Sequence, residues 1–92
     1  MKFIYPAVIR KEKETLYRAS FPDLEGCTAS GSTIDEVLED ANAAMRSWIE
    51  VELEEEDASL PAASDPADLP LGDGEFVRNI CITYRFLDGW EE

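Results

Sequence analysis

The chain has 92 residues, with 21 acidic and 8 basic side chains, no histidine and a formal charge of −13. This length is enough for one compact core and too short for two, so we predict a single domain over residues 1–92. Nucleic acid is bound through lysine and arginine surfaces, so the acidic balance argues against free nucleic acid as the main partner. It favours a basic protein partner, although an acid excess also serves simply to keep a small protein in solution.

The chain starts directly in a strand-like pattern, MKFIY, and no apolar run approaches the roughly 20 residues that a membrane-spanning helix needs. We therefore expect a cytoplasmic protein that does not bind a membrane. Cys27 and Cys81 fall in segments predicted to be extended, and we expect them to be small buried apolar residues and not a disulfide. Two cysteines without ligand-like spacing or histidine predict no metal site.

Two strands are predicted near the N-terminus. Residues 3–9 are rich in β-forming side chains, and Pro6 among them indicates an edge strand, a nearby bulge or a position whose missing amide no neighbour needs. The charged residues 11–14 predict a hairpin loop, and residues 16–21 predict a second, antiparallel strand.

A sharp turn follows the second strand. Proline cannot continue an inner strand and aspartate bonds readily to nearby backbone, so Pro22 and Asp23 predict a turn in which Leu24 folds inward. After a further bend at Gly26, residues 27–30 predict a short third strand.

The apolar period then changes from two to 3.6, which predicts an amphipathic helix over residues 34–54. Thr33 is suited to cap its N-terminus, and Glu36 is placed to reach back to the amide of the capping residue. We interpret Trp48 as packing in the core or at its rim, and not as a binding contact. The apolar stripe consists of Ile34, Val37, Leu38, Ala41, Ala44, Met45, Trp48 and Ile49.

The second half of the chain contains an acidic run, a long connection and a last strand. Residues 50–57, EVELEEED, hold six acids in eight positions; this run is either a solvated helix end or a docking segment for a basic partner. Residues 55–75, with three prolines and two glycines, predict an irregular connection that is either a surface crossover or a functional segment. Residues 76–86 alternate apolar and polar side chains and predict the last strand. The order β-β-β-α-β predicts an α+β, two-layer fold, in which a three-stranded antiparallel sheet plus a further strand carries one long helix on one face.

One set of residues carries a family resemblance. The pattern resembles the N-terminal domain of HicB-family antitoxins, and it consists of Tyr5, Ala7, Ile9, Phe21, Pro22, Asp23, Leu24, Gly26, Cys27, Gly31, Thr33 and Glu36. The resemblance implies a partial ribonuclease-H-like fold and the neutralisation of a small basic mRNA-cleaving toxin of the HicA type by stoichiometric occlusion. Longer members carry a DNA-binding domain, and nothing after Trp90 is suited to form one, so we expect no direct DNA binding.

An enzyme is the next class to consider, because a ribonuclease-H-like fold suggests carboxylates converging on a divalent metal. The sequence supplies acids, but most of them lie at the helix start, where capping explains them. No histidine is available as a general base, and no glycine-rich phosphate loop is present. We therefore predict no catalysis, no cofactor and no metal. The acids concerned are Asp23, Glu25, Asp35, Glu36, Glu39 and Asp40.

The candidate partner-binding residues come from two parts of the chain, the predicted turn after the second strand and the C-terminal region. Asp23 and Glu25 lie in the predicted turn, where a rigid backbone presents charge, and Tyr84, Phe86 and Trp90 are aromatic side chains near the C-terminus. For Tyr84 and Phe86 a core position is an equally good interpretation. An alternative function is an orphan HicB-like module, structural or ligand-binding, that forms a homo-oligomer through its exposed sheet edge and has no toxin partner.

Overall fold

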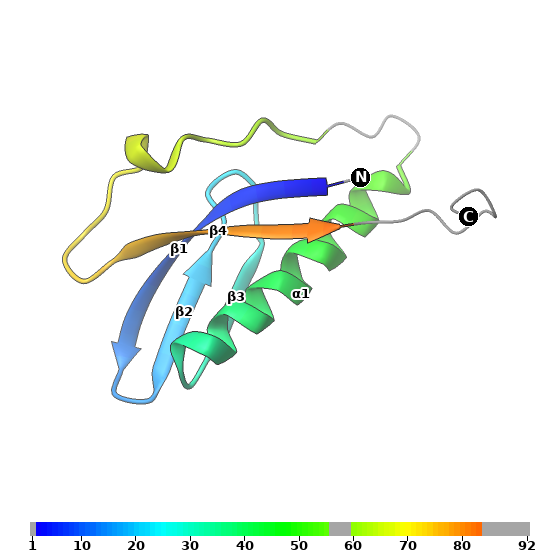
Figure 1. Ribbon diagram of the computed structural model, residues 1–92. Coiled ribbons are helices and arrows are strands. Elements are labelled where there is room, and N and C mark those ends of the chain that lie inside the picture. The colour runs from blue at the N-terminus through cyan, green and yellow to red at the C-terminus, as the bar shows by residue number, and fades with distance from the viewer. Residues whose placement is uncertain (1, 56–59, 84–92) are drawn as a thin grey trace.

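The computed structural model describes residues 2–55 and 60–83. The elements are β1 (Lys2–Lys13), β2 (Leu16–Ser20), β3 (Thr28–Gly31), α1 (Ile34–Leu53), the short 3-10 helix η1 (Pro66–Asp68) and β4 (Phe76–Thr83). The strands form one antiparallel sheet in the order β3-β2-β1-β4, and α1 crosses one face of it (Figure 1). The predicted α+β fold with the order β-β-β-α-β is confirmed.

β1 is an inner strand, so the prediction of an edge position for it was wrong. It pairs with β4 along its first part, and with β2 only from Val8 onward. Pro6 lies opposite Asn79 of β4 and precedes the part of β1 that pairs with β2. β2 therefore does not need the amide that proline lacks, which was the remaining interpretation of Pro6.

The hairpin between β1 and β2 is tighter than predicted. β1 continues through most of the charged stretch to Lys13, with an irregularity in the pairing between Lys11 and Lys13, and only Glu14 and Thr15 form the turn. Charged side chains are compatible with this strand end because it is exposed to solvent on both faces.

The core lies between α1 and the sheet face that it covers. Alternate side chains of β1 (Tyr5, Ala7 and Ile9) are buried on that face. They meet the apolar stripe of α1, whose buried members are Val37, Ala41, Met45 and Ile49. The apolar stripe of the helix faces the sheet as predicted and supplies the packing that holds it there, except that Ile34 at its start is exposed.

The start of α1 is capped largely as predicted. The Thr33 hydroxyl accepts a hydrogen bond of 3.1 Å from the Glu36 amide. The Glu36 carboxylate accepts one of 3.0 Å from the Ser32 amide, one residue before the amide that was predicted. Gly31 brings β3 very close to this turn, since a Cβ there would lie 2.7 and 2.9 Å from atoms of Glu36 and closer still to the Val37 amide nitrogen. Only glycine fits between β3 and α1 without a shift of the helix.

The two cysteines differ in their surroundings. Cys27 is buried, and burial raises the pKa of its thiol. Cys81 is exposed, which corrects the prediction that both are buried. The reason is register: Ile80 and Ile82 of β4 point toward α1, so Cys81 lies on the opposite face, beside Ile4 of β1. Neither cysteine forms a disulfide.

Side chains of α1 bond to backbone groups on both outer strands of the sheet. On β3, the Ser30 amide donates to the Asp40 carboxylate at 3.1 Å. On β4, the Asn42 side-chain amide donates to the Cys81 carbonyl at 3.3 Å, and Arg46 donates to the Thr83 carbonyl at 3.1 Å. These backbone groups are occupied, and an added strand cannot use them without displacing the helix side chains.

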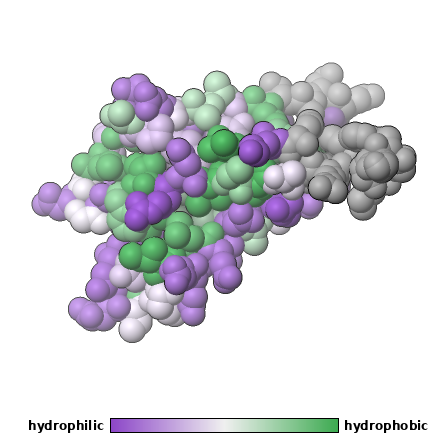
Figure 2. Space-filling model, in the orientation of Figure 1, coloured by the Kyte–Doolittle hydropathy of each residue, from purple (hydrophilic) through white to green (hydrophobic). Residues whose placement is uncertain are grey.

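The surface is mixed. Figure 2 shows green apolar and purple hydrophilic residues interspersed on one face, with purple ones also at its edges. Within the described ranges, no helix has the length and apolar character required to cross a membrane.

Candidate functional site

The β2–β3 turn is a compact loop that closes on itself. The Phe21 amide donates to the Cys27 carbonyl at 3.1 Å, and the amides of Leu24 and Cys27 donate to carbonyls within the same turn. Leu24 is fully buried, as predicted, and Gly26 has a φ of 80°, a value that favours glycine. The turn therefore presents Asp23 and Glu25 on a backbone that is held by its own hydrogen bonds.

Asp23 faces the connection that follows α1, far along the chain. Its carboxylate accepts two hydrogen bonds from Ser64, one from the amide at 2.8 Å and one from the hydroxyl at 2.6 Å. Nearby, the Tyr5 hydroxyl donates to the Pro61 carbonyl. Both carboxylate oxygens of Asp23 thus hold the connection against the body of the protein, a role that sequence reasoning did not predict.

Trp48 contacts the other side of the same turn. Its indole nitrogen donates to the Glu25 carbonyl at 3.0 Å, and its ring is partly buried against the core. The interpretation of Trp48 as packing at the core rim is confirmed. The Glu25 side chain itself is exposed.

An open groove of about 460 Å³ runs beside Trp48, between the β2–β3 turn and the second half of α1. Val51 forms part of its wall with 61% of its surface exposed, which is the largest exposure among the described large apolar residues. We call this the Trp48 groove. It is lined by Gly26, Cys27, Thr28, Ala44, Ser47, Trp48, Val51 and Glu52.

A second open groove, of about 490 Å³, follows the same junction of β3 and α1 toward the start of the helix. We call it the acidic groove. Thr28 of β3 and Ala44 of α1 line the Trp48 groove, and Ser30 of β3 and Ala43 of α1 line the acidic groove, so the two grooves are neighbours along the junction of β3 and α1. The acidic groove is lined by Ser30, Gly31, Glu36, Glu39, Asp40 and Ala43.

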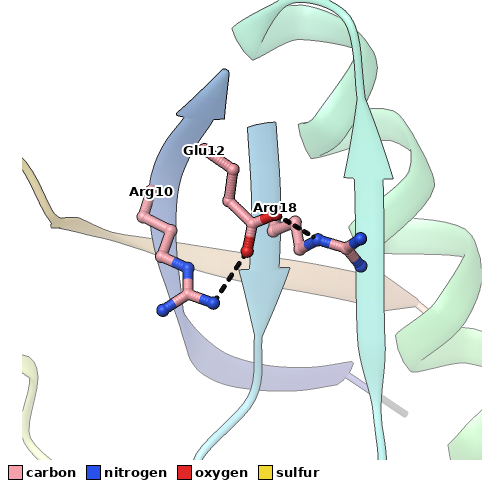
Figure 3. A network of polar contacts seen from close by, with 3 residues as sticks. All are labelled: Arg10, Glu12 and Arg18. Atoms are coloured by element: carbon pink, nitrogen blue, oxygen red, sulfur yellow. Dashed lines mark hydrogen bonds and ion pairs between the residues drawn. The ribbon is translucent and has the colours of Figure 1, made fainter. Parts of the chain in front are cut away.

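The opposite face of the sheet carries two arginines that share one carboxylate partner. Arg10 of β1 pairs directly with Arg18 of β2, and Figure 3 shows the Glu12 carboxylate between the two guanidinium groups. Glu12 accepts hydrogen bonds from Arg10 at 2.8 Å and from Arg18 at 2.7 Å. Both hydrogen bonds lower the pKa of the Glu12 carboxyl, and the bond from Arg18 has the larger effect. Like charges opposite each other on neighbouring strands repel, so Glu12 has a structural role here. A cavity of about 200 Å³ lies beside the two arginines.

The structure thus places two of the five candidate partner-binding residues. Asp23 is half-buried and bonded to Ser64, whereas Glu25 is exposed and directly precedes the first lining residue of the Trp48 groove. Tyr84, Phe86 and Trp90 lie outside the described residues. The groove itself was not predicted, although the apolar Val51 on the polar side of the helix was a signal for it.

The acids in the described part of the chain do not converge on a possible metal position. Within residues 2–55 and 60–83, no group of three or more histidine, cysteine, aspartate or glutamate side chains could hold a metal ion. The Glu36 carboxylate accepts a hydrogen bond from the Ser32 amide at the helix start, as capping predicts, whereas the Asp40 carboxylate accepts one from the Ser30 amide of β3, which was not predicted.

Comparisons with known proteins agree on one family. The family model described as HicB_like antitoxin of bacterial toxin-antitoxin system matches residues 5–81. A chain of the HicA3 and HicB3 toxin-antitoxin complex is 29% identical, with a TM-score of 0.62, and the match covers 84% of this chain and 94% of that chain. A chain of a toxin-antitoxin complex from Streptococcus pneumoniae is 26% identical, with a TM-score of 0.73, and the match covers 90% of this chain and 70% of that chain.

The fold also recurs at lower identity. The N-terminal domain of the Burkholderia pseudomallei antitoxin HicB is 18% identical, with a TM-score of 0.72, and the match covers 91% of this chain and all of that chain. No curated protein sequence matches the chain. Because the family model spans most of the sequence, this chain belongs to the HicB-like antitoxin family of bacterial toxin-antitoxin systems, a family of non-enzymatic binding proteins.

Proposed function

We propose that this chain neutralises a small basic mRNA-cleaving toxin of the HicA type by binding it stoichiometrically and covering its RNA-binding or catalytic surface. The observation that carries the proposal is the match of residues 5–81 to the HicB-like antitoxin family. The similar chains from the HicA3 and HicB3 complex and from the Streptococcus pneumoniae complex support it, because both come from toxin-antitoxin complexes.

Charge supports the same proposal. A chain with a formal charge of −13 attracts a basic protein, and complementary charge raises the association rate more than it raises the final affinity. We therefore expect association with the toxin to slow as salt concentration rises, since salt screens exposed charges. Glu25 and Asp23 remain proposed contacts with the toxin, although both carboxylate oxygens of Asp23 accept hydrogen bonds from Ser64.

The test is a titration of toxin activity. Any small basic protein encoded next to this chain is purified, and its cleavage of a reporter RNA is measured with increasing amounts of this chain. We expect cleavage to stop at a fixed molar ratio and the chain alone to leave the RNA intact. Cleavage that persists in excess antitoxin, or the absence of a basic neighbouring protein, would refute the proposal.

The alternative, an orphan module that assembles into a homo-oligomer through its sheet edge, predicts a different result. It expects a stable oligomer in light scattering and no effect on the toxin. The hydrogen bonds from α1 to Ser30, Cys81 and Thr83 work against strand pairing at those positions.

A further inference from the structure

Val51 is unusual among the residues of α1. It is a large apolar side chain, 61% exposed, next to the half-buried ring of Trp48 in an open groove. A single exposed apolar residue needs no explanation, but here exposure, an aromatic wall and a concave surface coincide. The residues between Trp48 and the acidic groove are small, Ala43, Ala44 and Ser47, so a partner can approach the helix backbone closely.

The charge around this groove points to the kind of partner. Glu52 lines the groove itself, and the neighbouring acidic groove adds Glu36, Glu39 and Asp40. The last turn of α1 contains no basic residue, so the negative end of the helix dipole adds to the charge of Glu52 without compensation, whereas Glu36, Glu39 and Asp40 lie nearer the positive end. Cations supplied by a partner would offset the negative charge at Glu52.

The opposite sheet face is more nearly balanced in charge. It also exposes an apolar side chain, Ile4, but its cavity is lined by Arg10 and Arg18 together with Glu75, and Glu12 pairs with both arginines. The two grooves beside α1 have acidic and no basic lining residues, so charge complementarity to a basic partner favours that surface over the outer face of the sheet.

We propose that the Trp48 groove is where this chain holds its basic toxin. An apolar side chain of the toxin enters the groove beside Trp48 and Val51, and lysine or arginine side chains of the toxin lie against Glu52 and the acidic groove. The proposal rests on the proposed function, and it adds the surface and the chemistry of the contact.

The central test is the variant Val51→Lys. Position 51 is exposed and lysine suits a helix, so the fold is expected to persist, which far-ultraviolet circular dichroism checks. The probe is the small basic protein that the titration above identifies as the toxin, in a catalytically inactive form, and binding is measured by calorimetry. We expect the Kd to rise at least about tenfold, as is common for substitutions at interface hot spots.

Two matched controls make the same apolar-to-lysine change elsewhere. Ile4→Lys alters the outer sheet face and Leu71→Lys alters the connection before β4; their side chains are 46% and 44% exposed. We expect both Kd values to stay within about twofold of the wild-type value, because surface changes away from an interface have small effects. A charge pair complements them: Glu52→Lys is expected to slow association at low salt more than Glu14→Lys on the distant hairpin does.

The outcomes separate the two proposals. If the wild-type chain does not bind the toxin, the proposed function is wrong, and so is the proposal that the toxin binds in the Trp48 groove. If the wild type binds and Val51→Lys binds equally well, only the surface is wrong. Loss of binding in Ile4→Lys with retention in Val51→Lys would instead place the interface on the outer face of the sheet.

Discussion

Replacing Asp23 by alanine removes the acceptor of both hydrogen bonds that join the β2–β3 turn to Ser64 in the connection after α1. The connection then retains only its other contacts, among them the bond from the Tyr5 hydroxyl to the Pro61 carbonyl. We expect Asp23→Ala to destabilise the whole protein, because residues 41 positions apart lose a direct link.

The size of the effect follows from the environment of the pair. Hydrogen bonds to charged groups contribute about 1.5–3 kcal/mol each. Asp23 and Ser64 are only half-buried, so water replaces part of what is lost, and we expect the free energy of unfolding to fall by about 1–2 kcal/mol in total. Ser64→Ala removes only the hydroxyl donor and leaves the amide, so its effect should be smaller.

The assay is urea unfolding followed by circular dichroism, carried out as a double-mutant cycle with Asp23→Ala and Ser64→Ala. We expect a coupling energy of at least about 0.5 kcal/mol, as for other residues in direct contact. Asp73→Ala, the same substitution at an exposed position, is the control, and it should stay within about 0.5 kcal/mol of the wild type. An Asp23→Ala protein as stable as this control, with additive effects in the cycle, would refute the structural role of Asp23.

Three further predictions concern other parts of the fold. Gly31→Ala should lower the free energy of unfolding by about 1–3 kcal/mol, because the added methyl group meets the backbone of α1. In the control Gly72→Ala the added methyl group makes only ordinary van der Waals contacts, so the free energy of unfolding should not fall. Equal stabilities of the two variants would contradict this prediction. Cys81 should react with iodoacetamide in the native protein and Cys27 only after unfolding, since burial raises the pKa of the Cys27 thiol and shields it; mass spectrometry of the labelled peptides decides. Burial raises the pKa of the Tyr5 hydroxyl above 10.0, and the charge of Asp23 raises it further. The stability that depends on the protonated hydroxyl is therefore complete below pH 10.0 and is lost as the pH rises through the folded-state pKa. In unfolding experiments Tyr5→Phe should remove this alkaline dependence, and an unchanged dependence would show that another group causes it.

Local sequence signals predicted those parts of the protein that depend on neighbouring residues. The change of apolar period at Ile34 predicted α1 almost to its last residue, and Thr33 and Glu36 predicted its cap. Pro22, Leu24 and Gly26 predicted the turn, because proline, a buried leucine and a glycine with positive φ act over a few positions. The same residues carry the family resemblance, which the family model confirms.

The predictions that failed depended on strand order and register. Pro6 indicated either an edge strand or a position whose amide no neighbour needs. The edge position was wrong, because β1 lies between β2 and β4, and the second interpretation fits, because β2 pairs with β1 only from Val8 onward. Cys81 was expected in the core, and the register that points Ile80 and Ile82 toward α1 puts it on the opposite face.

The candidate site also came from long-range contacts. The sequence by itself determined the helix, its acidic side, the turn and the excess of negative charge, because each is a property of composition or of local backbone preference. Only the tertiary structure brought Ser64 to Asp23, joined Trp48 to the Glu25 carbonyl and opened a groove beside Val51. The physical reason is that these contacts join segments more than 20 residues apart, and the packing of the connection and α1 against the sheet decides which of them meet.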